Sequence, residues 1–128
     1  MIKPRPGAIA QVAQRAAAGG SFEFELADFL HEFAFRGEES MLTEEPPLLR
    51  DFSEKGALYD AYLAAVAAYL APRQGFRTPT WTRHPERILA MPWFASPGRH
   101  MRALLLVESP AAFRERNLFV TANALSVA

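Results

Sequence analysis

The sequence predicts an all-α fold, with residues 1–128 forming a single compact helical domain. Apolar residues recur at intervals of three and four along several segments, which is the period of a helix with one buried face. Glycine and proline interrupt these segments, so the helices are expected to be separate. We expect two or three longer helices in the N-terminal part and a C-terminal half of short helices joined by Pro-rich turns. Half of the 128 residues are apolar, which is enough for a core without disulfides.

The first 36 residues are predicted to contain two helices. The apolar spacing favours one helix over 7–18 and a second, rich in phenylalanine, over 22–36. Ser21 is suited to capping the start of the second helix, and Gly37 to ending it. A strand is the alternative for 22–26, where polar and apolar residues alternate, but the residues that follow break the alternation.

The clearest helix is expected over 57–71, where a wide apolar stripe is combined with five alanines that allow close approach of a second helix. Residues 38–54 before it read as an irregular acidic loop, because Pro46-Pro47 prevents a continuous helix. One helical turn is expected near 40–45. The other expected elements are an extended connector over 72–83, short helices over 84–90, 99–107 and 110–116, a buried extended piece over 118–120, and a last turn over 122–126.

Charge is distributed unevenly, although the net charge is zero. Residues 1–20 carry +3, residues 21–60 carry −8 and residues 61–128 carry +5. One interpretation is that the acidic and basic parts form ion pairs with each other inside one fold. The other is that the charges form a dipolar surface that attracts a charged partner.

The composition excludes several kinds of reactive site. There is no cysteine, and hence no disulfide, thiolate nucleophile, Cys-ligated zinc or iron–sulfur cluster. The three histidines, His31, His84 and His100, have no second ligand at a known metal spacing, and no phosphate-binding Gly loop is present. We therefore expect no metal, no cofactor and no enzymatic activity. No run approaches the ~20 apolar residues of a membrane span, and the first residues do not resemble a signal peptide, so a soluble cytoplasmic protein is expected.

A nucleic-acid-binding regulator is one function that the residues allow. Trp81 and Trp93 are interleaved with arginines, a pattern of single-strand binding, although such aromatics also pack irregular turns onto a core. The zero net charge weakens this alternative. Residues 7–36 do not resemble a DNA-reading helix-turn-helix, because the second helix carries four carboxylates. The arginines that would contact phosphate are Arg77, Arg83, Arg87, Arg99, Arg102, Arg114 and Arg116.

The C-terminal half carries a resemblance to a known family. Its motifs are Pro79-Thr80-Trp81, His84-Pro85-Glu86-Arg87-Ile88-Leu89, Pro92-Trp93-Phe94, and the segments 102–114 and 116–120. Through them, residues 57–128 are similar to a family of small bacterial proteins that occur beside nucleotidyltransferase-like toxins. The resemblance implies a non-catalytic antitoxin, one half of a toxin–antitoxin system, whose partner is a nucleotidyltransferase-like protein.

The acidic loop is the expected partner-binding element of such an antitoxin. Nucleotidyltransferase clefts that accept nucleotide and RNA are basic, so the loop would occupy the cleft as a phosphate mimic. The expected acidic contacts are Glu38, Glu39, Glu44, Glu45, Asp51 and Glu54, and the expected apolar anchors are Leu42, Leu48 and Leu49. The same leucines, together with Met41, are also expected to anchor the loop on the core. A homo-oligomer with the phenylalanine-rich segment 22–36 at its interface is a further possibility.

Overall fold

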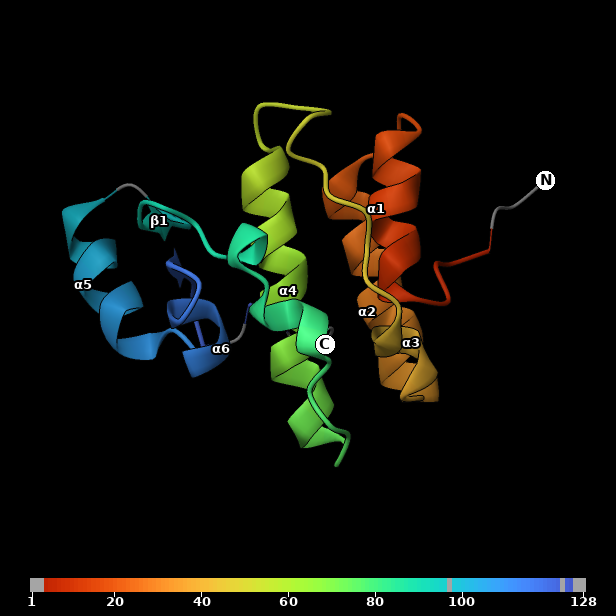
Figure 1. Cartoon of the computed structure of the whole chain (residues 1–128). Helices are drawn as coiled ribbons and strands as arrows, with labels where there is room; N and C mark the ends of the chain where they lie inside the picture. Colours follow the sequence, from red (N-terminus) through yellow and green to blue (C-terminus); the bar gives the residue numbers. More distant parts are fainter. Residues whose placement is uncertain (1–3, 97, 123, 126–128) are drawn as a thin grey trace.

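Helix α4 (Gly56–Arg73) runs through the middle of the molecule, and the other elements pack on its two sides (Figure 1). The computed structural model describes residues 4–96, 98–122, 124 and 125. The prediction of an all-α domain is confirmed, with one two-stranded sheet as the only addition among these residues. On one side lie α1 (Ile9–Ala17), α2 (Phe22–Arg36) and α3 (Ser40–Thr43), and on the other lie β1 (Trp93–Phe94), α5 (Arg99–Glu108), α6 (Ala111–Arg114) and β2 (Leu118–Phe119). The turns η1 (Thr80–Arg83) and η2 (Pro85–Arg87) pack on α4 between the two groups, and Trp81 of η1 contacts Leu42 of α3.

Helices α1 and α2 form a hairpin whose ends follow the sequence signals. The Phe24 amide donates to the Ser21 hydroxyl at 3.3 Å, so Ser21 caps α2 as predicted. Gly37 ends α2 with φ 55°, a left-handed conformation that glycine adopts without strain. The turn between the helices leaves no room for a side chain at Gly20, where a Cβ would lie 2.9 Å from the Arg15 carbonyl oxygen.

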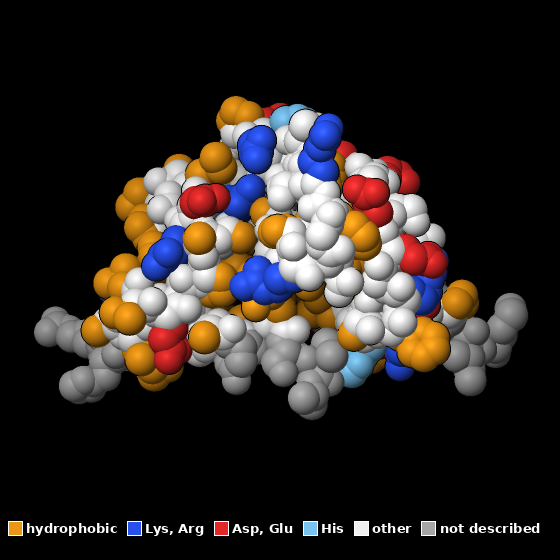
Figure 2. Space-filling model, turned by 90° about the horizontal axis from the view of Figure 1, so that it is seen from below, with side chains coloured by type: hydrophobic (Ala, Val, Ile, Leu, Met, Phe, Trp, Pro, Cys, Tyr) orange, Lys and Arg blue, Asp and Glu red, His pale blue; other side chains and the backbone are white. Residues whose placement is uncertain are grey.

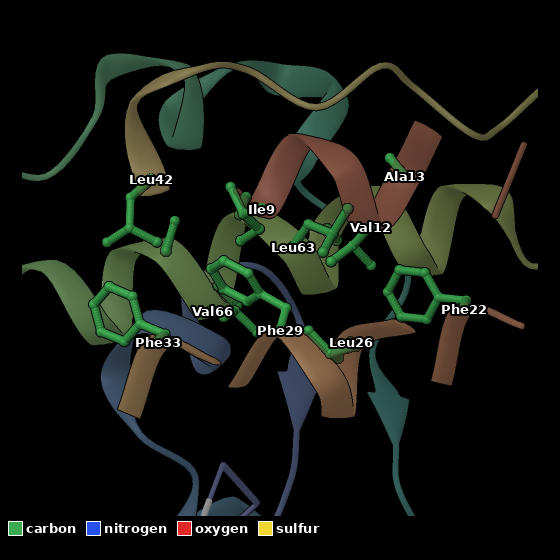
Figure 3. Close-up of a cluster of buried hydrophobic side chains, with 14 of the residues drawn as sticks. Ile9, Val12, Ala13, Phe22, Leu26, Phe29, Phe33, Leu42, Leu63 and Val66 are labelled. Carbon is green, nitrogen blue, oxygen red and sulfur yellow. The ribbon is translucent and has the colours of Figure 1, made fainter. Parts of the chain in front are cut away.

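The core lies between this hairpin and α4. Figure 3 shows Ile9 and Val12 of α1 and Phe29 of α2 directed toward Leu63 and Val66 of α4. The alanines of α4 let the neighbouring elements approach closely, as expected from the sequence, and α4 is buried on most of its circumference along its middle turns. Pro72 does not end α4, which continues to Arg73, because a proline in the last turn removes only one helical hydrogen bond.

The C-terminal half differs from the prediction in two connections. The short helix expected over 84–90 is reduced to the single turn η2, and residues 80–83, which were expected to be extended, form the turn η1. Strands β1 and β2 pair in parallel, with Trp93 opposite Leu118. Asn117, with φ 63°, ends the α6 turn, and its carbonyl accepts the Trp93 amide at 2.8 Å. The expected extended piece at 118–120 is therefore confirmed as part of a sheet.

Helix α5 packs little of its apolar surface against the rest of the molecule. Leu105 is fully buried, whereas Leu104, Leu106 and Val107 are exposed. Val107 is 78 % exposed, because α5 lies at the edge of the molecule (Figure 1). The last turn predicted over 122–126 falls partly outside the described residues. No helix in the described part of the chain has the length and apolar character needed to cross a membrane.

Candidate protein-interaction surface

The acidic loop, residues 38–54, is stretched along the molecule. It contains α3 at one end of the hairpin and then follows α4 to the opposite end, where α4 begins (Figure 1). Glu38 and Glu39 lie at the first end, and Asp51 and Glu54 lie at the second. The six predicted acidic contacts are therefore spread along one edge and are not gathered in one cluster.

Two of the six carboxylates are paired inside the molecule. Glu38 accepts a hydrogen bond from Arg36 at 2.6 Å, and Glu45 contacts both Arg87 at 3.1 Å and His84 at 3.3 Å. The remaining four are exposed, and their side chains have no ion pair or hydrogen bond within the described residues: Glu39, Glu44, Asp51 and Glu54. These four unpaired acids leave a strip of negative charge on the surface.

The interpretation that the acidic and basic parts neutralise each other is therefore correct only locally. Among the described residues, ion pairs between residues 21–60 and residues 61–128 involve Arg87, which meets Glu45 and Asp60, and His84, which meets Glu45. The exposed arginines of the C-terminal half do not reach the acidic loop.

The leucines expected to anchor a partner belong to the core instead. Leu42 is 1 % exposed and Leu49 is 2 % exposed, while Leu48 is half-buried. Their backbone groups are also engaged: the Trp81 indole donates to the Leu42 carbonyl at 3.1 Å, and the Leu49 amide donates to Asp60 Oδ1 at 2.6 Å. The expectation that they anchor a partner is wrong for Leu42 and Leu49, which are covered, and the expectation that they anchor the loop on the core is confirmed for these two.

Phe52 is the large apolar side chain that the acidic loop exposes, at 64 %. It borders a hollow of about 560 Å³ between the α1–α2 turn and the loop, with Ser53, Glu54 and Lys55 beside it. We call this the loop hollow. The sequence reasoning missed Phe52, although it is the single aromatic residue of the acidic segment.

A second hollow, the α2–α4 groove, has a volume of about 410 Å³. It adjoins the loop hollow, with which it shares Phe22, Glu23, Lys55 and Tyr59. Its walls are mainly apolar, and its polar lining residues are Glu23, His31 and Lys55 beside the tyrosine hydroxyls. The apolar and aromatic lining residues are Phe22, Leu26, Ala27, Leu30, Leu58, Tyr59, Tyr62, Trp93 and Ala124.

The floor of the groove is uncharged at neutral pH. The Phe22 and Tyr59 rings are stacked with centroids 3.9 Å apart, and the Tyr59 hydroxyl donates to Glu23 Oε1 at 3.1 Å. Burial, and then the neighbouring Glu23, raise the pKa of Tyr59. Burial alone raises the pKa of Tyr62. The groove is thus suited to apolar side chains, with Glu23 and Lys55 at the boundary with the loop hollow.

Arg87 was among the arginines expected to contact nucleic acid, and the structure corrects this. Its side chain is fully buried and donates to the Asp60 carbonyl at 3.3 Å, to the Pro46 carbonyl and to Glu45 Oε2. The guanidinium carbon lies 5.1 Å from the centroid of the Trp81 ring. Arg87 therefore joins the acidic loop to α4 and is closed to a phosphate. Trp81, 4 % exposed, is a core residue and offers no stacking surface to a base.

Arg116 is also largely buried. It is 4 % exposed, and its guanidinium donates to the carbonyls of Thr82 and Ala112 at 2.7 to 3.1 Å. Of the other predicted arginines, Arg77, Arg83, Arg102 and Arg114 are exposed, and the side chain of Arg99 lies outside the described residues. The seven arginines consequently do not form a continuous basic strip.

Helix α2 exposes two phenylalanines outside both hollows. Phe24 is 64 % exposed and Phe35 is 86 % exposed. They are eleven residues apart, which is three helical turns, so they lie on one face. This is the face that the homo-oligomer hypothesis requires, and that hypothesis stays a prediction.

The histidines and carboxylates do not gather into a metal site within the described part of the chain. What the structure brings together is the exposed Phe52, the unpaired Glu54 and an apolar groove, around the start of α4. Apolar anchors beside charged groups are typical of protein interfaces. No family model, no curated protein and no solved structure matches this chain.

Proposed function

We propose that the protein is a non-catalytic antitoxin that neutralises a nucleotidyltransferase-like toxin by binding it in the cytoplasm. The observation that carries the proposal is the strip of unpaired acids, which ends at exposed Phe52 and the two hollows. Like charges without internal partners repel one another, and a basic partner surface removes that repulsion. The resemblance of residues 57–128 to proteins that occur beside such toxins supports this class of partner.

The proposed contact has two components. Glu39, Glu44, Asp51 and Glu54 face the basic cleft of the toxin, where they take the place of substrate phosphates and direct the encounter. Phe52 and the α2–α4 groove supply the apolar contact that makes the complex long-lived. Inhibition then follows from blocking the cleft and needs no reaction by the antitoxin.

The proposal is tested by co-expression with the nucleotidyltransferase-like protein encoded beside this gene. The test variant is Asp51→Lys/Glu54→Lys. The matched control is Glu86→Lys/Glu108→Lys, which makes the same charge change at two exposed residues outside the acidic loop. We expect the control to restore growth as the wild type does. The test variant should bind the toxin at least about tenfold more weakly by calorimetry, because juxtaposed like charges cost several kcal/mol.

Two results contradict the proposal. One is the absence of a complex between the wild-type protein and the toxin by size-exclusion chromatography. The other is equal weakening by both double variants, which would mean that only the overall charge matters. Circular dichroism of each variant establishes that it is folded.

A further inference from the structure

A third hollow, of about 330 Å³, lies beside the C-terminal end of α4, away from the acidic loop. We call it the arginine pocket. Its polar lining residues are Arg73 of α4, Thr78 and Arg83 of the connector, and Glu115 and Arg116 after α6. Figure 2 shows this end of the molecule: Lys and Arg side chains gather over its middle and left, and most Asp and Glu side chains lie toward the right.

Arg116 is the fixed member of the pocket. Its Nε and Nη2 donate to the Thr82 carbonyl at 3.1 and 2.8 Å, and its Nη1 donates to the Ala112 carbonyl at 2.7 Å. These bonds use three of the five N–H donors of the guanidinium. The hydrogen-bond partners of this buried cation are neutral carbonyls, so besides its one ion pair, with Glu115, it has donors left for an anion.

Arg83 and Arg73 add two cations with little compensation. Arg83 is exposed, and its side chain has no hydrogen bond or ion pair within the described residues. Arg73 lies flat over the Tyr69 ring, 3.5 Å from its centroid, and donates from Nη1 to the Tyr69 carbonyl. Its guanidinium is thereby oriented but not neutralised.

The charge of the pocket is therefore unbalanced. Glu115 is its only carboxylate among the described lining residues. Its Oε2 lies 3.8 Å from Arg116 Nη1, and its side chain is 71 % exposed. Burial lowers the pKa of Arg116, Glu115 acts in the opposite direction, and Arg83 lowers the pKa again. Arg83 and Arg116 both line the pocket, so their like charges repel each other, and an anion between them would remove the repulsion.

We infer that the arginine pocket binds the phosphate group of a phosphate ester. Guanidinium groups form paired hydrogen bonds with phosphate oxygens, and the volume is large enough for a phosphate group with part of the molecule that carries it. The Thr78 side chain adds a hydroxyl donor to the lining. The phosphate comes either from a free nucleotide or from the backbone of an RNA. This site is separate from the acidic loop, so it is independent of the proposed antitoxin contact.

The test is titration calorimetry with inorganic phosphate, pyrophosphate and a mononucleotide. Arg83→Ala should weaken binding about tenfold, since one charge-assisted contact is lost. Arg102→Ala is the matched control: Arg102 is exposed on α5 over the Phe94 ring, outside the pocket, and its removal should change affinity less than about twofold. Glu115→Gln should strengthen binding about two- to fivefold, because it removes the carboxylate that competes with the anion.

Fluorescence anisotropy with a labelled single-stranded RNA distinguishes the two phosphate sources. Binding of pyrophosphate or nucleotide that depends on Arg83, without binding of RNA, identifies a free phosphate ester. RNA binding that depends on Arg83 and exceeds nucleotide binding identifies the backbone of a nucleic acid. The inference is overturned if neither probe binds, or if Arg83→Ala and Arg102→Ala weaken binding equally.

Discussion

Arg87 Nη1 and Asp60 Oδ1 lie 3.8 Å apart inside the protein, and neither side chain is exposed to solvent. Asp60 also accepts the Leu49 amide, and Arg87 also contacts Glu45. The pair therefore joins α4, the acidic loop and the η2 turn. Arg87 Nε is buried without a hydrogen-bond partner in the described residues. One N–H donor of the guanidinium therefore has no acceptor.

Replacing Arg87 by methionine should destabilise the protein by about 3 kcal/mol, because it removes the buried cation beside Asp60 and leaves that carboxylate with Arg50, 3.4 Å away and partly exposed, as its cation. Urea denaturation followed by circular dichroism measures the effect. The control is Arg77→Met, an exposed arginine whose removal should cost less than about 0.5 kcal/mol. A loss below about 1 kcal/mol for Arg87→Met would show that the pair contributes little.

The stability of the protein should depend on pH through Asp60. Burial raises the pKa of Asp60, and the Leu49 amide, Arg87 and Arg50 offset this only in part. The folded protein thus keeps this proton to higher pH than the unfolded chain does. The stabilisation is complete below the unfolded pKa, about 3.9, and is lost as pH rises through the folded value.

The measurement compares wild type with Asp60→Asn by urea denaturation from about pH 3.5 to pH 7, a range that begins below the pKa of an unfolded aspartate. Asparagine keeps the acceptor for the Leu49 amide and does not titrate in this range. The free energy of unfolding of the wild type, minus that of the variant, should fall as pH rises. A difference that is constant or rises with pH would mean that burial does not dominate the pKa of Asp60.

The helices could be predicted from the sequence where a local signal marks their ends. Ser21 and Gly37 bound α2 as expected, because capping depends on residues within one turn of the helix end. Asn117 ends the α6 turn for the same local reason. The pairing of β1 with β2 had no such signal, since each strand has two residues and its partner is 25 positions away.

The candidate site was predicted less well, because burial in an irregular segment follows no period. For Leu42 and Leu49 the sequence allowed both an anchor on the core and an anchor for a partner, because the side that each presents depends on contacts with Trp81 and Asp60. The burial of Arg87 could not be predicted from the sequence either, because its carbonyl acceptors belong to Pro46 and Asp60, which are 41 and 27 residues away in the chain.

Gly56→Ala should be destabilising although alanine favours helices. A Cβ at Gly56, the first residue of α4, would lie 1.9 Å from the Leu49 carbonyl oxygen, so the acidic loop must move away from α4. We expect a loss of about 1–3 kcal/mol in urea denaturation. Gly98→Ala is the control, because nothing lies within 4 Å of a Cβ there and the effect should stay below about 0.5 kcal/mol. Equal stability of the two variants would contradict the close approach of Leu49 to α4.

Phe52→Ala should weaken binding to the toxin without lowering the stability of the fold. Phe52 is 64 % exposed, so its truncation should change the free energy of unfolding by less than about 0.5 kcal/mol. If Phe52 anchors the toxin, the same change should cost about 2 kcal/mol of binding, which is a roughly thirtyfold rise in Kd by calorimetry.

Phe24→Ala is the matched control for this measurement, because Phe24 is also 64 % exposed but lines neither hollow. It removes the same apolar area from the surface of α2, so a general effect of surface hydrophobicity would appear equally in both variants. We expect Phe24→Ala to bind the toxin as the wild type does. If it weakens the complex while Phe52→Ala does not, the toxin contacts the exposed face of α2, and the acidic loop is not the centre of the interface.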